Sequence, residues 1–339
     1  MSTADLSGVV PPSLETGYPV LCSPFYPQTR AGLAEWTGRL GVFPNGSAAA
    51  RFAEADFPRA AALCVPHAME AERLLLAAAN IGLLTAFDDV VEALDADADR
   101  HVRRMTAVVS MEPVPGPMSP LETCVAELYE RLRDLLNDGQ WTVTTHETRR
   151  FFHEILTLAR GTLHGPDLPV EQYLDRRALD LGNYVLYPIV EMCLGIDLGP
   201  VRGHELLHEL HRCHAKAIAI QDDLVSFRKE HGGTHVKNLV LLAHRRGTPM
   251  QDAVGEVHRL YRSYLDRFER AARALEAASF PHQAVVDRYT MEMRHFVAGV
   301  AGWFEDSCRY SLADTSTWRP TQTAHLTTHT DQPTGPPTQ

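Results

Sequence analysis

The sequence predicts an all-α protein, and three observations support this prediction. No segment of the 339 residues shows the β-branched, two-residue alternation that is typical of strands. About ten segments carry apolar residues at helical spacing, and several of them are apolar on more than one face. No repeat occurs at a period of 20–50 residues, so we expect one helical bundle with a buried centre rather than a solenoid.

The first part of the chain is expected to pass from an irregular strap into helices. Residues 1–20 are rich in Pro, Gly and Ser, which favours irregular backbone. Two short helices follow, the second at residues 51–61. Residues 67–94 then form one long helix with Pro66 at its start, and residues 95–120 are expected to be part helix and part surface loop.

The later helices are predicted from apolar periodicity and from the turn residues between them. An Asn-Asp-Gly turn at residues 137–139 separates two amphipathic helices, and Gly182 with Pro188 predicts a kink or break. His231 and the two glycines after it are expected to end a long helix. The predicted helical ranges are 120–136, 141–163, 170–194, 205–230, 236–245, 249–278 and 281–310.

We expect a single domain at residues 21–312, followed by a tail. Residues 313–339 are rich in Thr and Pro and almost without large apolar side chains, so we expect disorder there. The start of the chain lacks a basic region followed by an apolar core, which argues against a signal peptide. No apolar run reaches the roughly 18 residues expected of a membrane span.

The composition of the chain limits which binding partners and which cellular compartment we expect for the protein. The net charge of −11 argues against nucleic acid, since phosphate backbones require clustered Lys and Arg. The six cysteines form no CxxC pair, and we interpret them as reduced core thiols of a cytoplasmic protein. His211 and His214 lack metalloprotease spacing and are expected on a helix surface. No GxSxG, Walker A or GxGxxG sequence occurs.

One acidic cluster lies at the end of the helix predicted at residues 205–230. Asp222, Ser226 and Glu230 are spaced i, i+4, i+8, so their oxygens line one helical stripe. Carboxylate and hydroxyl oxygens are hard ligands that suit Mg²⁺ better than zinc or copper. Asp223 is turned by about 100° from this stripe and is expected to have a supporting role. Read alone, the pattern is also typical of a solvated acidic helix face.

A second acidic cluster ends the long helix predicted at residues 67–94. Asp88 and Glu92 are spaced i, i+4 and face the same way, while Asp89 is turned by about 100°. Adjacent carboxylates repel, and the helix macrodipole disfavours them further near a C-terminus. A bound cation would compensate for both effects, so the cluster indicates a second half of a metal site.

The two clusters together resemble the metal motifs of bacterial class I terpene synthases. DDVVE at residues 88–92 is similar to their aspartate-rich DDxx(D/E) motif. DDLVSFRKE at residues 222–230 is similar to their second motif, (N/D)Dxx(S/T)xx(K/R)(D/E), and the order and the separation (222 − 88 = 134) agree. Arg309 and Tyr310 resemble the family's terminal Arg-Tyr pair. The resemblance covers roughly residues 20–312.

The resemblance implies the class I terpenoid synthase fold and a metal-assisted diphosphate chemistry. Three Mg²⁺ ions are expected, held by Asp88 with Glu92 on one side of the cavity mouth. On the other side the resemblance implies the metal ligands Asp222, Ser226 and Glu230. Hydrogen bonds to the diphosphate are implied for Arg176, Lys229, Arg309 and Tyr310, and the catalytic residues of the prediction are Asp88, Arg176, Arg309 and Tyr310.

The diphosphate-sensing arginine and the backbone carbonyl that faces the substrate can each be assigned to either of two neighbouring residues. The family's diphosphate sensor is an arginine some 46 residues before the second motif, which favours Arg176 (222 − 46 = 176). Arg177 is the alternative, because it places Asp180 three residues on, where a linker residue could sit. The resemblance also implies that a backbone carbonyl at Gly182, or at Leu181, faces the substrate.

A carbocation would be quenched in a wet site, so the cavity below the metals has to be apolar. Aromatic faces can stabilise cations there. The aromatic residues nearest the motifs are candidates for this wall, with ordinary core packing as the alternative for each: Phe87, Tyr184, Tyr187, Trp303 and Phe304.

The function implied by the resemblance is loss of diphosphate from an acyclic prenyl diphosphate and cyclisation of the carbocation. Farnesyl (C15) or geranylgeranyl (C20) diphosphate is expected, with C15 favoured because it is frequent in the family, and a homodimer is the expected assembly. One alternative is a chain-elongating prenyltransferase, whose second motif would be another DDxxD where this chain has Ser226. Another is a non-catalytic helical binding or scaffold protein, which would not need both acidic clusters.

Overall fold

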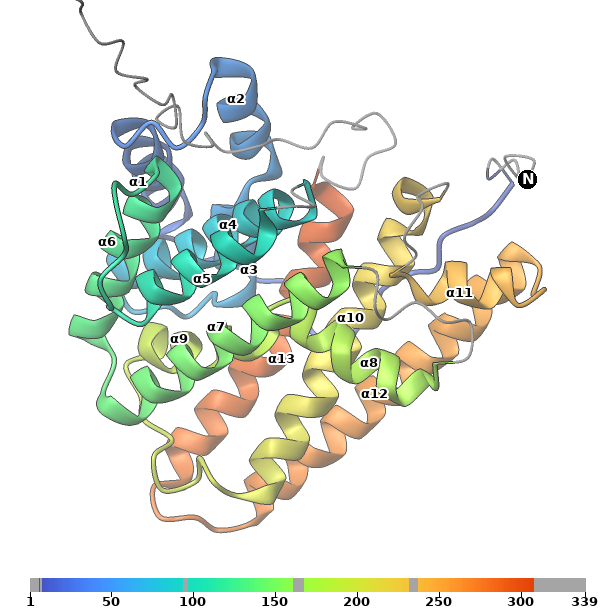
Figure 1. Ribbon diagram of the computed structural model, residues 1–339. Coiled ribbons are helices and arrows are strands. Elements are labelled where there is room, and N and C mark those ends of the chain that lie inside the picture. Colours follow the sequence, from blue (N-terminus) through green and yellow to red (C-terminus); the bar gives the residue numbers. More distant parts are fainter. Residues whose placement is uncertain (1–5, 7, 94–96, 161–167, 232–236, 308–339) are drawn as a thin grey trace, which may run out of the picture.

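The computed structural model describes residues 6, 8–93, 97–160, 168–231 and 237–307 (Figure 1). These residues form thirteen helices and no strand, which confirms the all-α prediction. The helices are α1 Tyr26–Arg39, α2 Gly46–Ala55, α3 Phe57–Cys64, α4 Ala71–Ala93, α5 Ala98–Val109, α6 Pro120–Leu135, α7 Asp138–Ala159, α8 Val170–Asp180, α9 Asn183–Leu194, α10 Glu205–Glu230, α11 Leu239–Arg245, α12 Met250–Ala277 and α13 Gln283–Asp306.

Two long apolar helices, α4 and α10, carry the acidic clusters and organise the bundle. Helix α10 packs against α8, α12 and α13, and α4 packs against α1, α3, α6 and α7. Figure 1 shows α11 and α12 on one side of the molecule and α1 to α6 on the other, with α10 and α13 between them. Both helices therefore need apolar side chains on several faces, which explains their largely apolar sequences before the acidic clusters.

The predicted bounds match best where a helix is long and ends on a turn residue. Helix α10 covers residues 205–230 as predicted. The prediction for α4 was wrong at its start, because Pro66 lies in a turn closed by the Ala68 amide on the Val65 carbonyl (3.2 Å), and the helix begins at Ala71. Helix α7 begins before residue 141, because Asn137 and Gln140 form a capping box there.

The segment predicted to kink contains a clean break at one of its two candidate residues. Gly182 adopts a left-handed conformation (φ +65°) between α8 and α9, where a side chain would be strained. Pro188 lies inside α9 without ending it. The backbone therefore turns at Gly182, with its amide on the Leu179 carbonyl (2.9 Å), and α9 starts in a new direction.

Helices α13 and α3 approach so closely that their backbones touch. A Cβ atom at Gly299 would lie 2.2 Å from the carbonyl oxygen of Leu63, closer than real atoms approach. Only glycine fits at this position of α13. The two helices are therefore fixed against each other beside the central cavity.

The irregular strap predicted at the start of the chain lies against α12. The hydroxyl of Tyr261 donates to the Leu14 carbonyl (3.2 Å), and Arg262 donates to the Glu15 carbonyl (2.8 Å). No helix or strand is assigned at the described positions before α1. The tail predicted at residues 313–339 lies outside the described residues, and the bounds of the domain at 21–312 stay a prediction.

One helix is long and apolar enough to cross a membrane by length and composition alone. It runs from Ala71 to Glu92, so the estimate that no apolar run reaches span length was wrong. In the fold, 78% of the apolar window is buried inside the protein, as in a core helix. The apolar residues of α4 are explained by packing.

Two predictions about single side chains were wrong. His214 is fully buried, with Nδ1 at 3.1 Å from the Tyr187 hydroxyl, rather than on a helix surface. Burial lowers the pKa of His214 to about 3, because the charged imidazolium would lose its hydration. Four of the five described cysteines are buried free thiols, as predicted, whereas Cys22 is exposed.

Candidate active site

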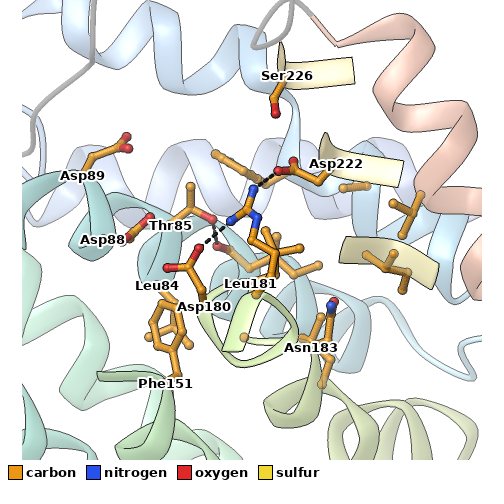
Figure 2. A pocket seen from close by; sticks show the side chains of 18 of the residues that line it. Leu84, Thr85, Asp88, Asp89, Phe151, Asp180, Leu181, Asn183, Asp222 and Ser226 are labelled. Atoms are coloured by element: carbon orange, nitrogen blue, oxygen red, sulfur yellow. Dashed lines mark hydrogen bonds and ion pairs between the residues drawn. The ribbon is translucent and has the colours of Figure 1, made fainter. Parts of the chain in front are cut away.

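A cavity of about 520 Å³ opens between the two acidic clusters (Figure 2). Residues of α3, α4, α7, α8, α9, α10 and α13 line it, together with the Gly182 break and Lys237. Aromatic and aliphatic side chains form much of its wall: Phe57, Leu84, Phe151, Leu186, Ile218, Phe296, Val300, Trp303 and Phe304. The site thus combines an apolar chamber with converging polar groups, the usual composition of a small-molecule site.

Helix α4 contributes the first group of carboxylates. Asp88, Asp89 and Glu92 each offer an oxygen, and these oxygens lie within 4.8 Å of one another. Burial raises the pKa of Asp88 well above its ordinary value, although the nearby Lys237 ammonium lowers it. The Oδ1 atom of Asp88 is buried and accepts no hydrogen bond from the part of the chain that the structure describes.

Helix α10 contributes the second group. Asp222, Ser226 and Glu230 all line the cavity, as their i, i+4, i+8 spacing predicts. Figure 2 shows Asp222 and Ser226 across the pocket from Asp88. Burial raises the pKa of Glu230, and its buried Oε2 has no hydrogen-bond donor among the described residues.

These groups fit a divalent metal ion. A carboxylate that is buried without a donor is costly, and a cation is the usual compensation. Asp88 and Glu230 each present such an oxygen, one from each side of the cavity. All of the groups are hard oxygen ligands without a thiolate or imidazole among them, the donor set that Mg²⁺ and similar ions prefer.

The structure separates the two candidate sensor arginines. Arg177 is buried and lines the cavity, where it pairs with Asp222 and Asp180. Arg176 is turned outward, and its Nε donates to Glu154 (2.7 Å). The choice of Arg176 by spacing therefore named the residue outside the cavity, because one helical step rotates a side chain by about 100°.

Asp223 has the supporting position expected of it. It accepts hydrogen bonds from Arg177 Nε (3.0 Å), from the Tyr173 hydroxyl (2.7 Å) and from the Leu239 amide (2.8 Å). Burial raises the pKa of Asp223 to about 7, against the lowering effect of Arg177. Asp223 thus orients Arg177 from behind the cavity wall.

Two lysines stand at the mouth of the cavity, and only one was predicted. Lys229 lines the cavity, as its place in the second motif suggests. Lys237 also lines it and contacts Glu92. No motif identifies Lys237, which lies seven positions beyond Glu230, and no other local pattern of the sequence marks it.

The remaining predicted site residues divide into three groups. Arg309 and Tyr310 lie outside the described residues. Trp303 and Phe304 line the cavity as expected, and so do Leu181 and Gly182 at the break. Three predicted wall candidates do not appear among the described lining residues: Phe87 and Tyr187, which are core residues, and Tyr184, which is partly buried against the core.

The core aromatics are held by neighbouring rings. Phe87 packs edge-on against Phe152 (5.0 Å between ring centres), and Tyr187 stacks on His211 (4.0 Å). A position near a motif in the sequence therefore did not indicate whether a ring faces the cavity or the core. The aromatic residues described in the cavity wall come from three helices instead, α3, α7 and α13.

Comparison with known proteins identifies the family. The model of terpene synthase family 2, C-terminal metal binding, matches residues 79–267, which is more than half of the chain and includes both acidic clusters. A (2Z,6E)-hedycaryol synthase of Kitasatospora setae is 26% identical over 319 residues, covering 89% of this chain and 93% of the relative. An isoafricanol synthase of Streptomyces violaceusniger is 28% identical over 312 residues, covering 85% and 81%.

A further relative carries its substrate in its name. It is a corvol ether synthase of Kitasatospora setae, described as cyclising (2E,6E)-farnesyl diphosphate, and is 24% identical over 315 residues, covering 89% of this chain and 95% of the relative. Among solved structures, hedycaryol synthase in complex with HEPES has a TM-score of 0.77 at 22% identity, covering 88% of this chain and 99% of that one.

The family match and the fold agree with the geometry of the cavity. Two facing carboxylate groups with an arginine between them, above an apolar chamber, are suited to ionising a prenyl diphosphate and enclosing the carbocation. Neither the elongating prenyltransferase nor the non-catalytic scaffold is favoured by relatives that are synthases and cyclases. The chain therefore belongs to the bacterial class I terpene synthase family, whose members release diphosphate from an acyclic prenyl diphosphate and cyclise the cation.

Proposed function

We propose that the protein is a sesquiterpene synthase that converts farnesyl diphosphate (C15) with the help of three Mg²⁺ ions. The relative named as a farnesyl diphosphate cyclase supports the substrate. The cavity of about 520 Å³ lies within the roughly 300–1,000 Å³ of small-molecule sites and suits a folded hydrocarbon chain. Geranylgeranyl diphosphate (C20) is the second candidate substrate.

The metal ligands that we propose come from the two sides of the cavity. Asp88 and Glu92 would bind Mg²⁺ from α4, and Asp222, Ser226 and Glu230 would bind it from α10. Bound Mg²⁺ supplies a Lewis acid that neutralises the diphosphate oxygens. The single observation that carries the proposal is that both carboxylate groups line one cavity, although 134 residues separate Asp88 from Asp222 (222 − 88 = 134).

We propose Arg177, rather than Arg176, as the diphosphate sensor. Its guanidinium lies in the cavity wall, is oriented by Asp223, and offers planar donors that match phosphate oxygens. Lys229 would donate from the rim of the cavity. Arg309 and Tyr310 remain proposed donors on the resemblance of their motif alone.

Residues that line the cavity below the diphosphate would position the hydrocarbon part of the substrate and stabilise its carbocation. Trp303 and Phe304 offer aromatic faces to a developing carbocation. Gly182 breaks the helix at the cavity wall, and because its own carbonyl accepts from the Val185 amide (3.1 Å), the Leu181 carbonyl is the one that we propose to face the cation. The apolar walls exclude water, which would otherwise capture the cation before cyclisation.

Incubation with C10, C15, C20 and C25 prenyl diphosphates and Mg²⁺, followed by gas chromatography and mass spectrometry, tests the substrate. We expect cyclic products from the C15 substrate. Asp222→Ala should remove product formation, and unchanged turnover by this variant would overturn the mechanism. A cyclic product from C20 alone would overturn the substrate while leaving the metal site intact.

We also propose a cytoplasmic homodimer with one catalytic domain at residues 21–312. Light scattering after size exclusion would measure its mass against the 37.7 kDa of one chain. Removing residues 313–339 should leave turnover unchanged, because the proposed diphosphate ligands all precede residue 311. A truncated protein without activity would show that the tail takes part in the site.

A further inference from the structure

Lys237 lies at the mouth of the cavity, where no metal motif of the sequence predicts a cation. Its ammonium pairs with Oε1 of Glu92 on α4. It also lies 3.8 Å from Oδ2 of Asp180 on α8. Lys237 therefore connects the aspartate-rich cluster to the carboxylate that holds Arg177.

The backbone next to Lys237 is anchored on the opposite side of the cavity. The side chain of Asn238 donates to the Asp223 carbonyl (2.9 Å) and to the Ser226 hydroxyl (3.1 Å), both on α10. The Leu239 amide donates to the Asp223 carboxylate (2.8 Å). Lys237 is thus rooted beside the second motif and reaches across to the first.

The charges around Lys237 are matched to an ammonium. Burial lowers its pKa, but the nearby carboxylates of Asp180, Glu92 and Asp88 outweigh this effect and raise the pKa well above its ordinary value. Lys237 in turn lowers the pKa of Asp88, against the larger effect of burial. The ammonium therefore neutralises Glu92 and Asp88, the two carboxylates of α4 that are proposed to bind a metal ion.

We propose that Lys237 is a resident counter-cation that competes with the divalent metal for the aspartate-rich cluster. This inference rests on the proposed metal site at Asp88 and Glu92. An ammonium paired with Glu92 repels an incoming cation and occupies one of its ligands. Lys237 holds α4 and α8 together in the metal-free protein, and metal binding displaces it from Glu92.

The consequence is an order of binding at the cavity mouth. Metal alone binds weakly, because it has to displace the ammonium. Metal arriving with a diphosphate binds tightly, because the anion offsets the repulsion between the two cations and offers the displaced ammonium a partner. Lys237 is therefore a positioning residue that couples metal binding to the presence of substrate.

Titration calorimetry with Mn²⁺ alone, without diphosphate, tests the inference on the full chain. Lys237→Gln should bind Mn²⁺ roughly fivefold or more tightly than the wild type, since one like charge is removed from the site. Its melting temperature without metal should fall, because three carboxylates lose their cation. Lys237→Arg keeps the charge and should behave as the wild type does in both measurements.

Lys216→Gln is the matched control. Lys216 is also a largely buried lysine between two carboxylates, Glu171 (2.9 Å) and Asp175 (2.6 Å), but it is not among the described residues that line the cavity. Its loss should lower the melting temperature without changing the affinity for Mn²⁺. A second neutral variant, Lys237→Met, keeps the aliphatic stem and replaces the Gln variant if that one does not fold.

The failures of this inference and of the proposed site are distinguishable. If Asp88→Asn abolishes Mn²⁺ binding while the neutral variants of Lys237 bind Mn²⁺ no more tightly than the wild type, the counter-cation inference is overturned and the metal site stands. If the neutral variants lose only affinity for inorganic diphosphate, Lys237 is a phosphate donor and the inference is again overturned. If Asp88→Asn binds Mn²⁺ as the wild type does, the proposed site itself fails.

Discussion

The Nε of Arg177 donates a hydrogen bond to Oδ1 of Asp223 over 3.0 Å and so ties helix α8 to helix α10 at the cavity wall. The same guanidinium reaches Asp180 and Asp222 with its other nitrogens. All four side chains are at least nine-tenths buried. One arginine thus holds a carboxylate from the helix break and two from the second metal motif.

Replacing Arg177 should therefore affect both stability and turnover. Arg177→Ala leaves three buried carboxylates without their partner, which should cost about 3–5 kcal/mol of unfolding free energy. Arg177→Lys keeps the charge but loses the planar fork, and kcat/KM should fall about 100-fold. Denaturant unfolding and steady-state diphosphate release measure the two effects.

Arg176→Ala is the control for this comparison. Its side chain pairs with Glu154, which is buried and is not among the described residues that line the cavity, so kcat/KM should stay within about threefold of the wild type even if stability falls. A large loss of turnover in Arg176→Ala, with Arg177→Lys unaffected, would reverse the assignment of the sensor.

Chelation should abolish turnover and lower stability together. With EDTA, diphosphate release should stop, and Mg²⁺ should restore it, whereas Ca²⁺ should restore less because it favours longer bonds and more ligands. With diphosphate present, metal at about 100 times its dissociation constant for one site should raise the unfolding free energy by about 3 kcal/mol. Full turnover in EDTA would contradict the metal site.

The aromatic wall should control the length of the substrate. Phe296 lines the cavity and is buried, so Phe296→Ala enlarges the chamber. We expect the ratio of C20 to C15 turnover to rise several-fold, at a cost of about 3–5 kcal/mol in unfolding free energy. Competition assays with both diphosphates measure this ratio.

Phe268→Ala separates the loss of stability from the change in the cavity. Phe268 is fully buried on α12 and is not among the described residues that line the chamber. It should lose similar stability and keep the C20 to C15 ratio of the wild type. Equal ratios in all three proteins would show that Phe296 does not limit chain length.

Acid should destabilise the protein through His214. Its pKa is about 3 in the folded state and about 6.5 in an unfolded chain, so below pH 6.5 the unfolded chain binds a proton that the folded protein does not. Stability therefore falls with pH through this window, by about 2 kcal/mol at pH 5.

Thermal and denaturant unfolding between pH 7 and pH 5 would test this dependence. His214→Gln cannot take up the proton, so its stability should vary less with pH over this range than that of the wild type. His146→Gln, at an exposed site, should keep the slope of the wild type. An unchanged slope in His214→Gln would exclude His214 as the source.

The sequence predicted those features that depend on neighbours along one helix. The stripe of Asp222, Ser226 and Glu230 follows from helical geometry, and the break at Gly182 follows from a residue that a helix tolerates poorly. Spacing could not decide between Arg176 and Arg177, because spacing between motifs is not accurate to one residue and one residue changes the face of the helix.

Features that depend on contacts between helices were not predictable. Lys237 lies 145 residues from its partner Glu92, and nothing local marks it. His214 lies on α10, which α8, α12 and α13 cover on several faces. The helix therefore lacks a clear polar face and a clear apolar face, and its sequence does not indicate which side chains are buried. For the same reason the aromatics of the cavity wall could not be separated from those of the core.

Gly299 determines how this enzyme can be redesigned. Because α13 touches α3 through backbone atoms at Leu63, the distance between these helices cannot increase without losing a direct contact, nor decrease at all. The shape of the chamber can then change only through exchange of the side chains that line it. A library for new terpene skeletons should therefore keep Gly299 and vary the lining residues Phe57, Phe296 and Val300. The helices then keep their positions, and only the shape of the cavity around the substrate changes.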